Sequence, residues 1–198
     1  MLLAVSKTKP AAEIVAVAVA GQRHFGENYL QEALEKIEVL KNLDLDWHFI
    51  GPIQSNKTRR IAENFNWVHS VDRLKIAQRL SEQRPDTLPP LNICLEVNIS
   101  REPSKHGLNI EELSCIIPKV ASLPRLSLRG LMAIPAPSKG FTAQRLPYAR
   151  LRKLQEELIA QGMQLDTLSM GMSDDLEAAI AEGTTIVRVG TAIFGPRE

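Results

Sequence analysis

Hydrophobic residues follow two alternating patterns along this chain. Short apolar runs, typical of buried strands, alternate with longer stretches in which apolar residues recur three and four positions apart, as on one face of a helix. Eight runs predict strands, at 2–6, 23–27, 47–51, 67–71, 92–99, 126–134, 167–170 and 186–190. Seven stretches between them predict helices, at 11–20, 29–42, 56–65, 72–83, 109–122, 147–161 and 174–182.

This alternation favours a parallel sheet, because parallel neighbours need a crossover connection and a helix supplies it. The repeats can close into a (β/α)8 TIM barrel or open into a doubly wound sheet. A dinucleotide-binding sheet has GxGxxG after its first strand, whereas this turn reads SKTKPA, so the barrel is favoured. No linker-like stretch interrupts residues 1–198, which predicts a single domain.

Two details of the helices are also expected. Pro147 should open the sixth helix at its first turn, because proline fits that position. No eighth helix is predicted before the first strand or after the last one. One flank of a closed barrel would then lie uncovered.

Composition and charge exclude several classes of function. Hydrophobic residues make up 44% of the 198 positions, enough to bury one core. With 24 Lys and Arg against 23 Asp and Glu, no broad field attracts nucleic acid or an anionic membrane. No apolar run approaches the roughly 18 residues of a membrane span, and no signal peptide is recognisable. We expect a cytoplasmic protein, and the two cysteines match no zinc-binding spacing.

Lys7 is the first candidate for chemistry. Leu3, Val5 and Lys7 share one face of the first strand, and barrel enzymes build their sites where strands end. An amine partly withdrawn from water there can form an imine with an aldehyde. A surface lysine at a strand end is the alternative, and Lys9 is the competing amine.

The last two strand ends predict an anion site. Ser173 is expected to cap the seventh helix, where free N–H groups can bind an anion. Arg188 is a charge within an apolar strand and must find a partner, while Gly190 and Thr191 follow it. Barrels commonly bind phosphate after strands seven and eight. Ordinary helix capping is the alternative for Ser173.

Three further positions give weaker signals. Asn28 could bond a ligand ring or simply begin a helix. Met132 could form a wall of a ligand site, although a core methionine is the simpler reading. His48 is interpreted as a core histidine rather than a base. No GxSxG, HExxH or Walker motif supports a hydrolase, zinc-protease or nucleotide function.

Six segments together resemble a known family. They read LAVSKTKP, FGENYLQE, WHFIGPIQSNK, RGLMAIPA, LSMGMSDDLEAAI and VRVGTAIFG, and they follow in order from residue 1 to about residue 197. The chain resembles the pyridoxal phosphate homeostasis proteins, single-domain relatives of alanine racemase. The resemblance implies a fold-type III barrel that holds pyridoxal 5′-phosphate as an aldimine (Schiff base) on Lys7. It implies these cofactor-binding residues: Lys7, Asn28, Met132, Ser169, Ser173, Arg188, Gly190 and Thr191.

The resemblance also implies intracellular cofactor homeostasis without substantial catalysis and without a metal. The expected protein partners are enzymes that lack their pyridoxal phosphate. The expected oligomeric state is a monomer or weak dimer. A small racemase or lyase is the alternative, and a phosphosugar enzyme with an imine on Lys7 is a third hypothesis. Family members have a helix before the AVSK segment, so we expect a shortened chain. The role of Lys105 is unassigned.

Overall fold

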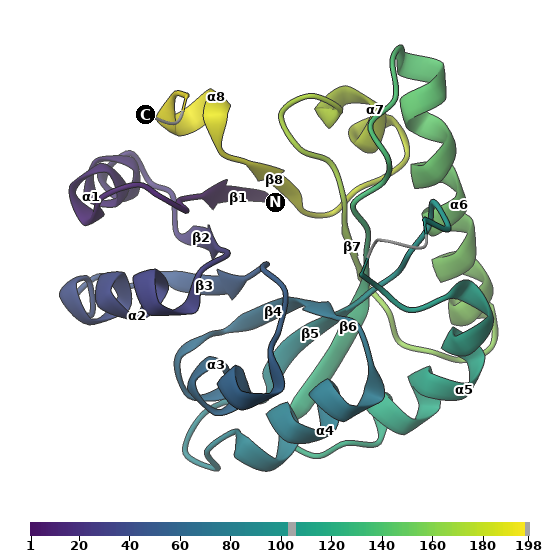
Figure 1. Cartoon of the computed structure of the whole chain (residues 1–198), viewed down its shortest axis with the longest axis horizontal. Coiled ribbons are helices and arrows are strands. Elements are labelled where there is room, and N and C mark those ends of the chain that lie inside the picture. The colour runs from purple at the N-terminus through teal and green to yellow at the C-terminus, as the bar shows by residue number, and fades with distance from the viewer. Residues whose placement is uncertain (103–105, 197–198) are drawn as a thin grey trace.

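The computed structural model describes residues 1–102 and 106–196, so Lys105 lies outside the described residues. Its eight strands are β1 (Leu2–Val5), β2 (His24–Glu27), β3 (Asp46–Phe49), β4 (Trp67–Val71), β5 (Leu91–Glu96), β6 (Leu126–Met132), β7 (Thr167–Ser169) and β8 (Val187–Val189). All pair in parallel in the order β7-β6-β5-β4-β3-β2-β1-β8. A bridge between Ser169 and Ile186 joins β7 to β8, and the sheet closes into the predicted barrel (Figure 1).

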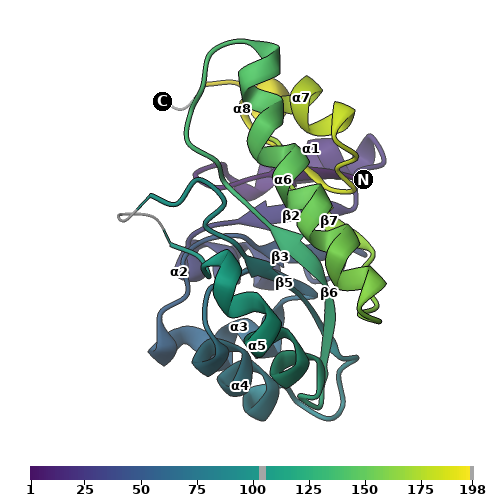
Figure 2. The same cartoon turned by 90° about the vertical axis from the view of Figure 1, so that its right-hand side faces the viewer.

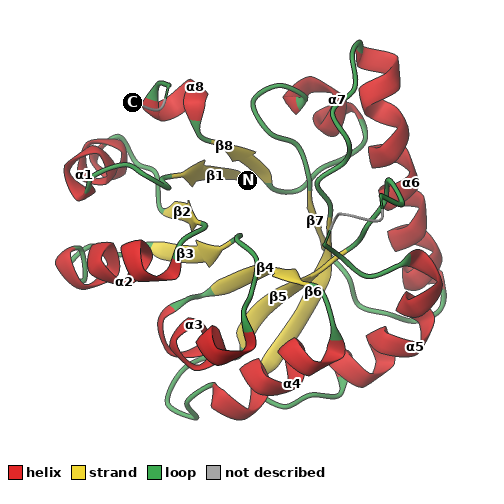
Figure 3. Cartoon of the chain, in the orientation of Figure 1, coloured by secondary structure: helices red, strands yellow, loops and turns green. Residues whose placement is uncertain are grey.

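Helices surround this barrel on its outer side (Figure 3). They are α1 (Ala11–Val19), α2 (Leu30–Val39), α3 (Thr58–Asn64), α4 (Leu74–Gln83), α5 (Ile110–Ala121), α6 (Phe141–Ala160), α7 (Leu176–Ala181) and α8 (Thr191–Phe194), with a 3₁₀ turn, η1, at Ser55–Lys57. In Figure 2 the long α6 lies outside β6 and β7. Within the described residues, no helix has both the length and the apolar character to cross a membrane.

Two expectations about the helices are wrong. Pro147 does not open the sixth helix, because α6 begins at Phe141 and encloses the proline. An internal proline typically costs about 3 kcal/mol, and the buried contacts of Tyr148, Leu151 and Leu158 offset this cost. An eighth helix also exists, since the four residues of α8 follow β8 directly.

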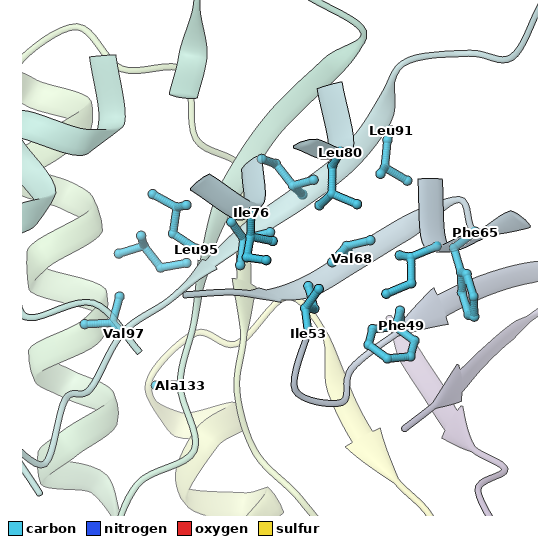
Figure 4. Packing of buried hydrophobic residues seen from close by; sticks show 14 of the residues in the cluster. Phe49, Ile53, Phe65, Val68, Ile76, Leu80, Leu91, Leu95, Val97 and Ala133 are labelled. Atoms are coloured by element: carbon cyan, nitrogen blue, oxygen red, sulfur yellow. The ribbon is translucent and has the colours of Figure 1, made fainter. Parts of the chain in front are cut away.

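The main hydrophobic core lies between the strands and their helices. Ile76 and Leu80 of α4 pack in one cluster with Val68 of β4 and Leu95 of β5 (Figure 4). Each of these side chains is fully buried, and burying one aliphatic side chain contributes about 1.5–3 kcal/mol. Helical spacing on α4 and strand alternation on β4 therefore meet at the same interface.

A second, more polar set of side chains fills the barrel. His48, His69, Ser169 and Arg188 come from β3, β4, β7 and β8, and none is more than 5% exposed. The interpretation of His48 as a core histidine is confirmed, whereas sequence reasoning overlooked His69. This polar interior sets the geometry of the candidate site.

Candidate functional site

Lys7 lies in the turn that follows β1 and is half-buried. It lines a hollow together with Val5, Gly190 and Thr191. Three predicted site residues, Lys7, Gly190 and Thr191, are thereby brought to one place. Lys9 also lines this hollow, but its Nζ lies 3.4 Å from the carbonyl oxygen of Pro196 and 3.7 Å from Glu13.

Gly190 and Thr191 mark the start of α8. Gly190 occupies the N-cap position and Thr191 is the first helical residue. The first N–H groups of a helix have no acceptor within it, so they can bind an anion. A Cβ on residue 190 would lie 3.3 Å from the carbonyl oxygen of Val5, so glycine lets β8 and β1 approach closely.

The expected helix cap at Ser173 is wrong. The helix α7 begins at Leu176 with Asp175 at its N-cap, and Ser173 lies exposed in the preceding turn. The Asp175 carboxylate makes no capping bond to α7 and instead has two partners outside that helix. One oxygen accepts the Met172 N–H at 2.7 Å, and the other accepts the Tyr148 hydroxyl at 2.7 Å. The hydroxyl of Ser173 is left on the exposed side of this turn.

Arg188 is buried in the barrel and bonded to neutral oxygens. Its Nη1 donates to the carbonyl oxygen of Ser169 at 2.6 Å and to the Ser169 Oγ at 2.8 Å. Its Nη2 donates to the carbonyl oxygen of Ala133 at 3.0 Å. Burial lowers the pKa of Arg188, and the nearby Tyr148 and Asp175 act in the opposite direction.

These bonds leave donors for a ligand. A guanidinium has five N–H donors, and the three bonds of Arg188 use both hydrogens of Nη1 and one of Nη2. The described residues supply no acceptor for the second Nη2 hydrogen or for the Nε hydrogen. An acceptor on a ligand could therefore bond Arg188 without displacing a protein contact.

The interior histidines are neutral. Nδ1 of His69 lies 2.7 Å from the Ser169 Oγ, and its Nε2 lies 2.9 Å from Nδ1 of His48. Burial, followed by the charge of Arg188, lowers the pKa of His69 to about 3. Burial also lowers the pKa of His48 well below its ordinary value, with further contributions from His69 and His24. Arg188 is consequently not accompanied by charged histidines.

Asn28 and Met132 lie at the ends of their strands. Asn28 follows β2, and its Oδ1 is buried without a hydrogen-bond partner in the described part of the chain. An orphaned acceptor of this kind is suited to a polar ligand. Met132 is the last residue of β6 and is buried.

A buried ion pair fixes the ends of β1 and β2. Nζ of Lys36 donates to Glu27 at 2.8 Å and to the carbonyl oxygen of Ser6 at 2.7 Å, while the Ser6 hydroxyl donates to Glu27 at 2.6 Å. Burial raises the pKa of Glu27, and the bonds from Lys36 and Ser6 oppose that shift. Because Ser6 precedes Lys7 and Glu27 precedes Asn28, the network fixes both strand ends. Sequence reasoning did not identify this network, because its members are far apart in the sequence: Ser6 and Lys36 are separated by 30 positions.

Comparisons with known proteins give the same architecture. The whole chain, residues 1–198, matches the family described as alanine racemase, N-terminal domain. The structure of PipY from Synechococcus elongatus without PLP superimposes with a TM-score of 0.93 at 41% identity, covering 98% of this chain and 92% of that one. PipY with PLP bound gives 0.91 at 40% identity over the same shares. Alanine racemase from Clostridium difficile, at 18% identity and a TM-score of 0.75, shares the fold over 98% of this chain and 52% of its own.

Curated relatives are closer in sequence. The pyridoxal phosphate homeostasis protein of Pseudomonas aeruginosa is 65% identical over 197 residues, which are 100% of this chain and 84% of that protein. The Escherichia coli K12 protein of the same name is 54% identical over 200 residues, 100% of this chain and 86% of that protein. The fold and the lysine-bearing mouth define the class of alanine-racemase-like barrels. Within that class, the chain belongs to the pyridoxal phosphate homeostasis protein family.

The neutral His69 predicts a pH dependence of stability. Its pKa is about 3 when folded and ordinarily about 6.5 when unfolded, so the unfolded chain binds the additional proton. The contribution of the neutral His69 to stability is therefore fully present above about pH 6.5 and is lost as the pH falls toward 3. Urea unfolding at several pH values gives the free energy of unfolding as a function of pH. Between these two pKa values, the slope of that free energy against pH should be shallower in His69→Phe by about 1.4 kcal/mol per pH unit.

A control for this measurement is His106→Gln, because the His106 side chain is 69% exposed and its contact with Asp72 is long, at 4.0 Å. An unchanged slope in His69→Phe would show that His69 is protonated in the folded protein.

Proposed function

We propose that this protein binds pyridoxal 5′-phosphate covalently through Lys7 and serves the homeostasis of that cofactor in the cytoplasm. One observation carries the proposal: the half-buried Lys7 shares a hollow with Gly190 and Thr191 at the start of α8. An amine and the backbone at a helix start, of a kind that suits a phosphate, thus lie at one mouth. The names of the relatives and the PLP-bound structure of PipY support the same cofactor.

The residues present fit each part of the cofactor. The bound group would supply an aldehyde carbon, and the Lys7 amine would be the nucleophile for it. Gly190, Thr191 and the exposed Ser173 would hold the phosphate. The two remaining N–H groups of Arg188 would bond the ring nitrogen or the phosphate. The unpartnered Oδ1 of Asn28 fits a donor on the ring.

Two residues would act at the boundary of this site. Met132 would form part of the wall, and Ser169 would act through its bonds to Arg188. In this proposal residues 1–198 form one alanine-racemase-like domain. Enzymes that lack their cofactor are the proposed recipients of the bound pyridoxal phosphate.

We further propose that the protein is not a catalyst. Racemisation needs an acid–base group on each face of the bound amino acid. Besides Lys7, three candidates are considered among the residues that the structure describes, and the contacts or exposure of each speak against this task. Tyr29 is 54% exposed, the Tyr148 hydroxyl bonds Asp175, and His48 is bonded within the barrel. If Arg188 bonded the ring nitrogen, that nitrogen would stay unprotonated, which would weaken carbanion stabilisation.

Borohydride reduction followed by peptide mapping tests the attachment site. The pyridoxyl group should be found on Lys7, and Lys7→Ala should lose the yellow colour. The matched variant Lys9→Ala should keep it, because Lys9 already contacts Glu13 and Pro196. Labelling of Lys9 or Lys57 in the unmodified sequence would refute the assignment.

The phosphate contacts are tested by affinity. A hydrogen bond to a charged group contributes about 1.5–3 kcal/mol, so Ser173→Ala should weaken cofactor binding roughly 10-fold or more. Ser122→Ala is the control, because Ser122 caps the far end of α5. Pyridoxal without its phosphate should bind much more weakly. Equal affinities for the two compounds would remove the phosphate site from the proposal.

The absence of catalysis is tested with free alanine in deuterated water. Exchange of its α-hydrogen should stay near background, because Tyr148 and His48 are engaged in other hydrogen bonds and Tyr29 is exposed. A purified alanine racemase provides the positive control. Exchange at an enzyme-like rate that disappears in Lys7→Ala would instead establish the racemase alternative.

A further inference from the structure

A row of hydrogen-bonded side chains crosses the interior of the barrel. It runs from Ser169 Oγ to His69 Nδ1 at 2.7 Å, from His69 Nε2 to His48 Nδ1 at 2.9 Å, and from His48 Nε2 to His24 Nδ1 at 3.2 Å. We call these four residues the histidine chain. The proposed function uses Ser169 and Arg188 and gives the three histidines no role.

The topology shows that this chain connects the two ends of the barrel. β4 and β7 are not neighbours in the sheet, so the bond between His69 and Ser169 spans the interior. Ser169 is the last residue of β7, at the end of the barrel that carries Lys7. His24 is the first residue of β2, at the opposite end, and its side chain is 30% exposed.

Because the buried rings are neutral, each carries one N–H, and all bonds of the chain must point the same way. If His48 Nε2 donates to His24, then His48 Nδ1 must accept from His69, and His69 Nδ1 must accept from the Ser169 hydroxyl. If the direction is reversed, the Ser169 Oγ accepts from both His69 and Arg188. Burial enforces neutrality, since it lowers the pKa of His69 to about 3 and that of His48 well below its usual range.

The contacts of Ser169 distinguish these two directions. Its Oγ already accepts a hydrogen from Arg188 at 2.8 Å. In the first direction its own hydrogen goes to His69 Nδ1, and the ring nitrogens of His69 and His48 are all bonded. His24 Nδ1 then faces the Asp46 carboxylate at 3.5 Å without donating to it, but both of these side chains are partly exposed, so water can bond them. In the second direction the Ser169 hydrogen has no acceptor among the residues that the structure describes, which is costly for a buried group. The first direction is therefore favoured.

We propose that His69, supported by His48, is a positioning residue that orients the Ser169 hydroxyl so that its oxygen holds Arg188 at the cofactor site. The other two bonds of Arg188 go to backbone carbonyls, so Ser169 Oγ is its one side-chain partner in the described structure. Trp67 stacks on His48 with ring centroids 5.5 Å apart and planes 7° from parallel, which fixes that ring. The consequence for the cofactor rests on the proposed function.

Nitrogen-15 spectra of the cofactor-free protein test the direction without any ligand. His69 and His48 should both be neutral with the hydrogen on Nε2. A hydrogen on Nδ1 of either ring, or a charged ring near neutral pH, would overturn the proposal. If the protein of unchanged sequence failed to bind pyridoxal phosphate, the proposed function would fall, and the spectra would still report the direction of the chain.

Two substitutions of His69 separate positioning from packing. In His69→Asn, the amide oxygen can replace Nδ1 as an acceptor for Ser169, but the smaller side chain leaves a cavity. In His69→Phe, the volume is kept and the acceptor is lost. Positioning predicts that the Phe variant binds pyridoxal phosphate roughly 10-fold more weakly, with a changed absorption spectrum, whereas the Asn variant binds within about twofold of the unchanged protein.

A purely structural role predicts the opposite order. The Asn variant would then be the weaker binder, since it is the less stable of the two in urea unfolding. Affinities that follow this stability order, or that remain unchanged in both variants, would overturn the proposal. Affinity that is lost with Phe and retained with Asn, against the order of stability, would support it.

Discussion

The burial of one guanidinium constrains the interior of this barrel. Arg188 has lost its water and forms no ion pair within the described residues, so its charge is balanced by two carbonyl oxygens and the Ser169 hydroxyl. These acceptors come from β7 and from the residue that follows β6. A buried hydroxyl is a good acceptor only when its own hydrogen is donated to another acceptor. His69 Nδ1, 2.7 Å from the Ser169 Oγ, is that acceptor. The histidines, in turn, must stay neutral beside this cation.

A second buried polar network lies at the end of β2, where Glu27 forms an ion pair with Lys36 of α2 and accepts the Ser6 hydroxyl. A buried ion pair is weak evidence for stability, because desolvation offsets much of the attraction. Its effect here is geometric: it joins the ends of β1 and β2 to α2, and these strand ends lead directly to Lys7 and Asn28. The turn that carries Lys7 is thus held in place by this network.

Closure of the barrel brings distant segments to one mouth. Lys7 follows the first strand and Thr191 follows the last, and the parallel pairing of β1 with β8 places them side by side. Membership of the pyridoxal phosphate homeostasis family agrees with this arrangement. A site made from both ends of the sequence requires only that the first and last strands be neighbours in the sheet.

The sequence by itself determined the eight strands, the barrel and the family, because periodicity and local motifs are carried by neighbouring residues. It also indicated Lys7, because this lysine closely follows the end of β1. It misplaced the cap at Ser173 and the role of Pro147, since Asp175, bonded to Tyr148, holds the N-cap position and α6 is held by packing. His69, Glu27 and Lys36 were overlooked for the same reason. Their partners lie on other strands or helices, and only the tertiary structure decides which buried polar groups meet.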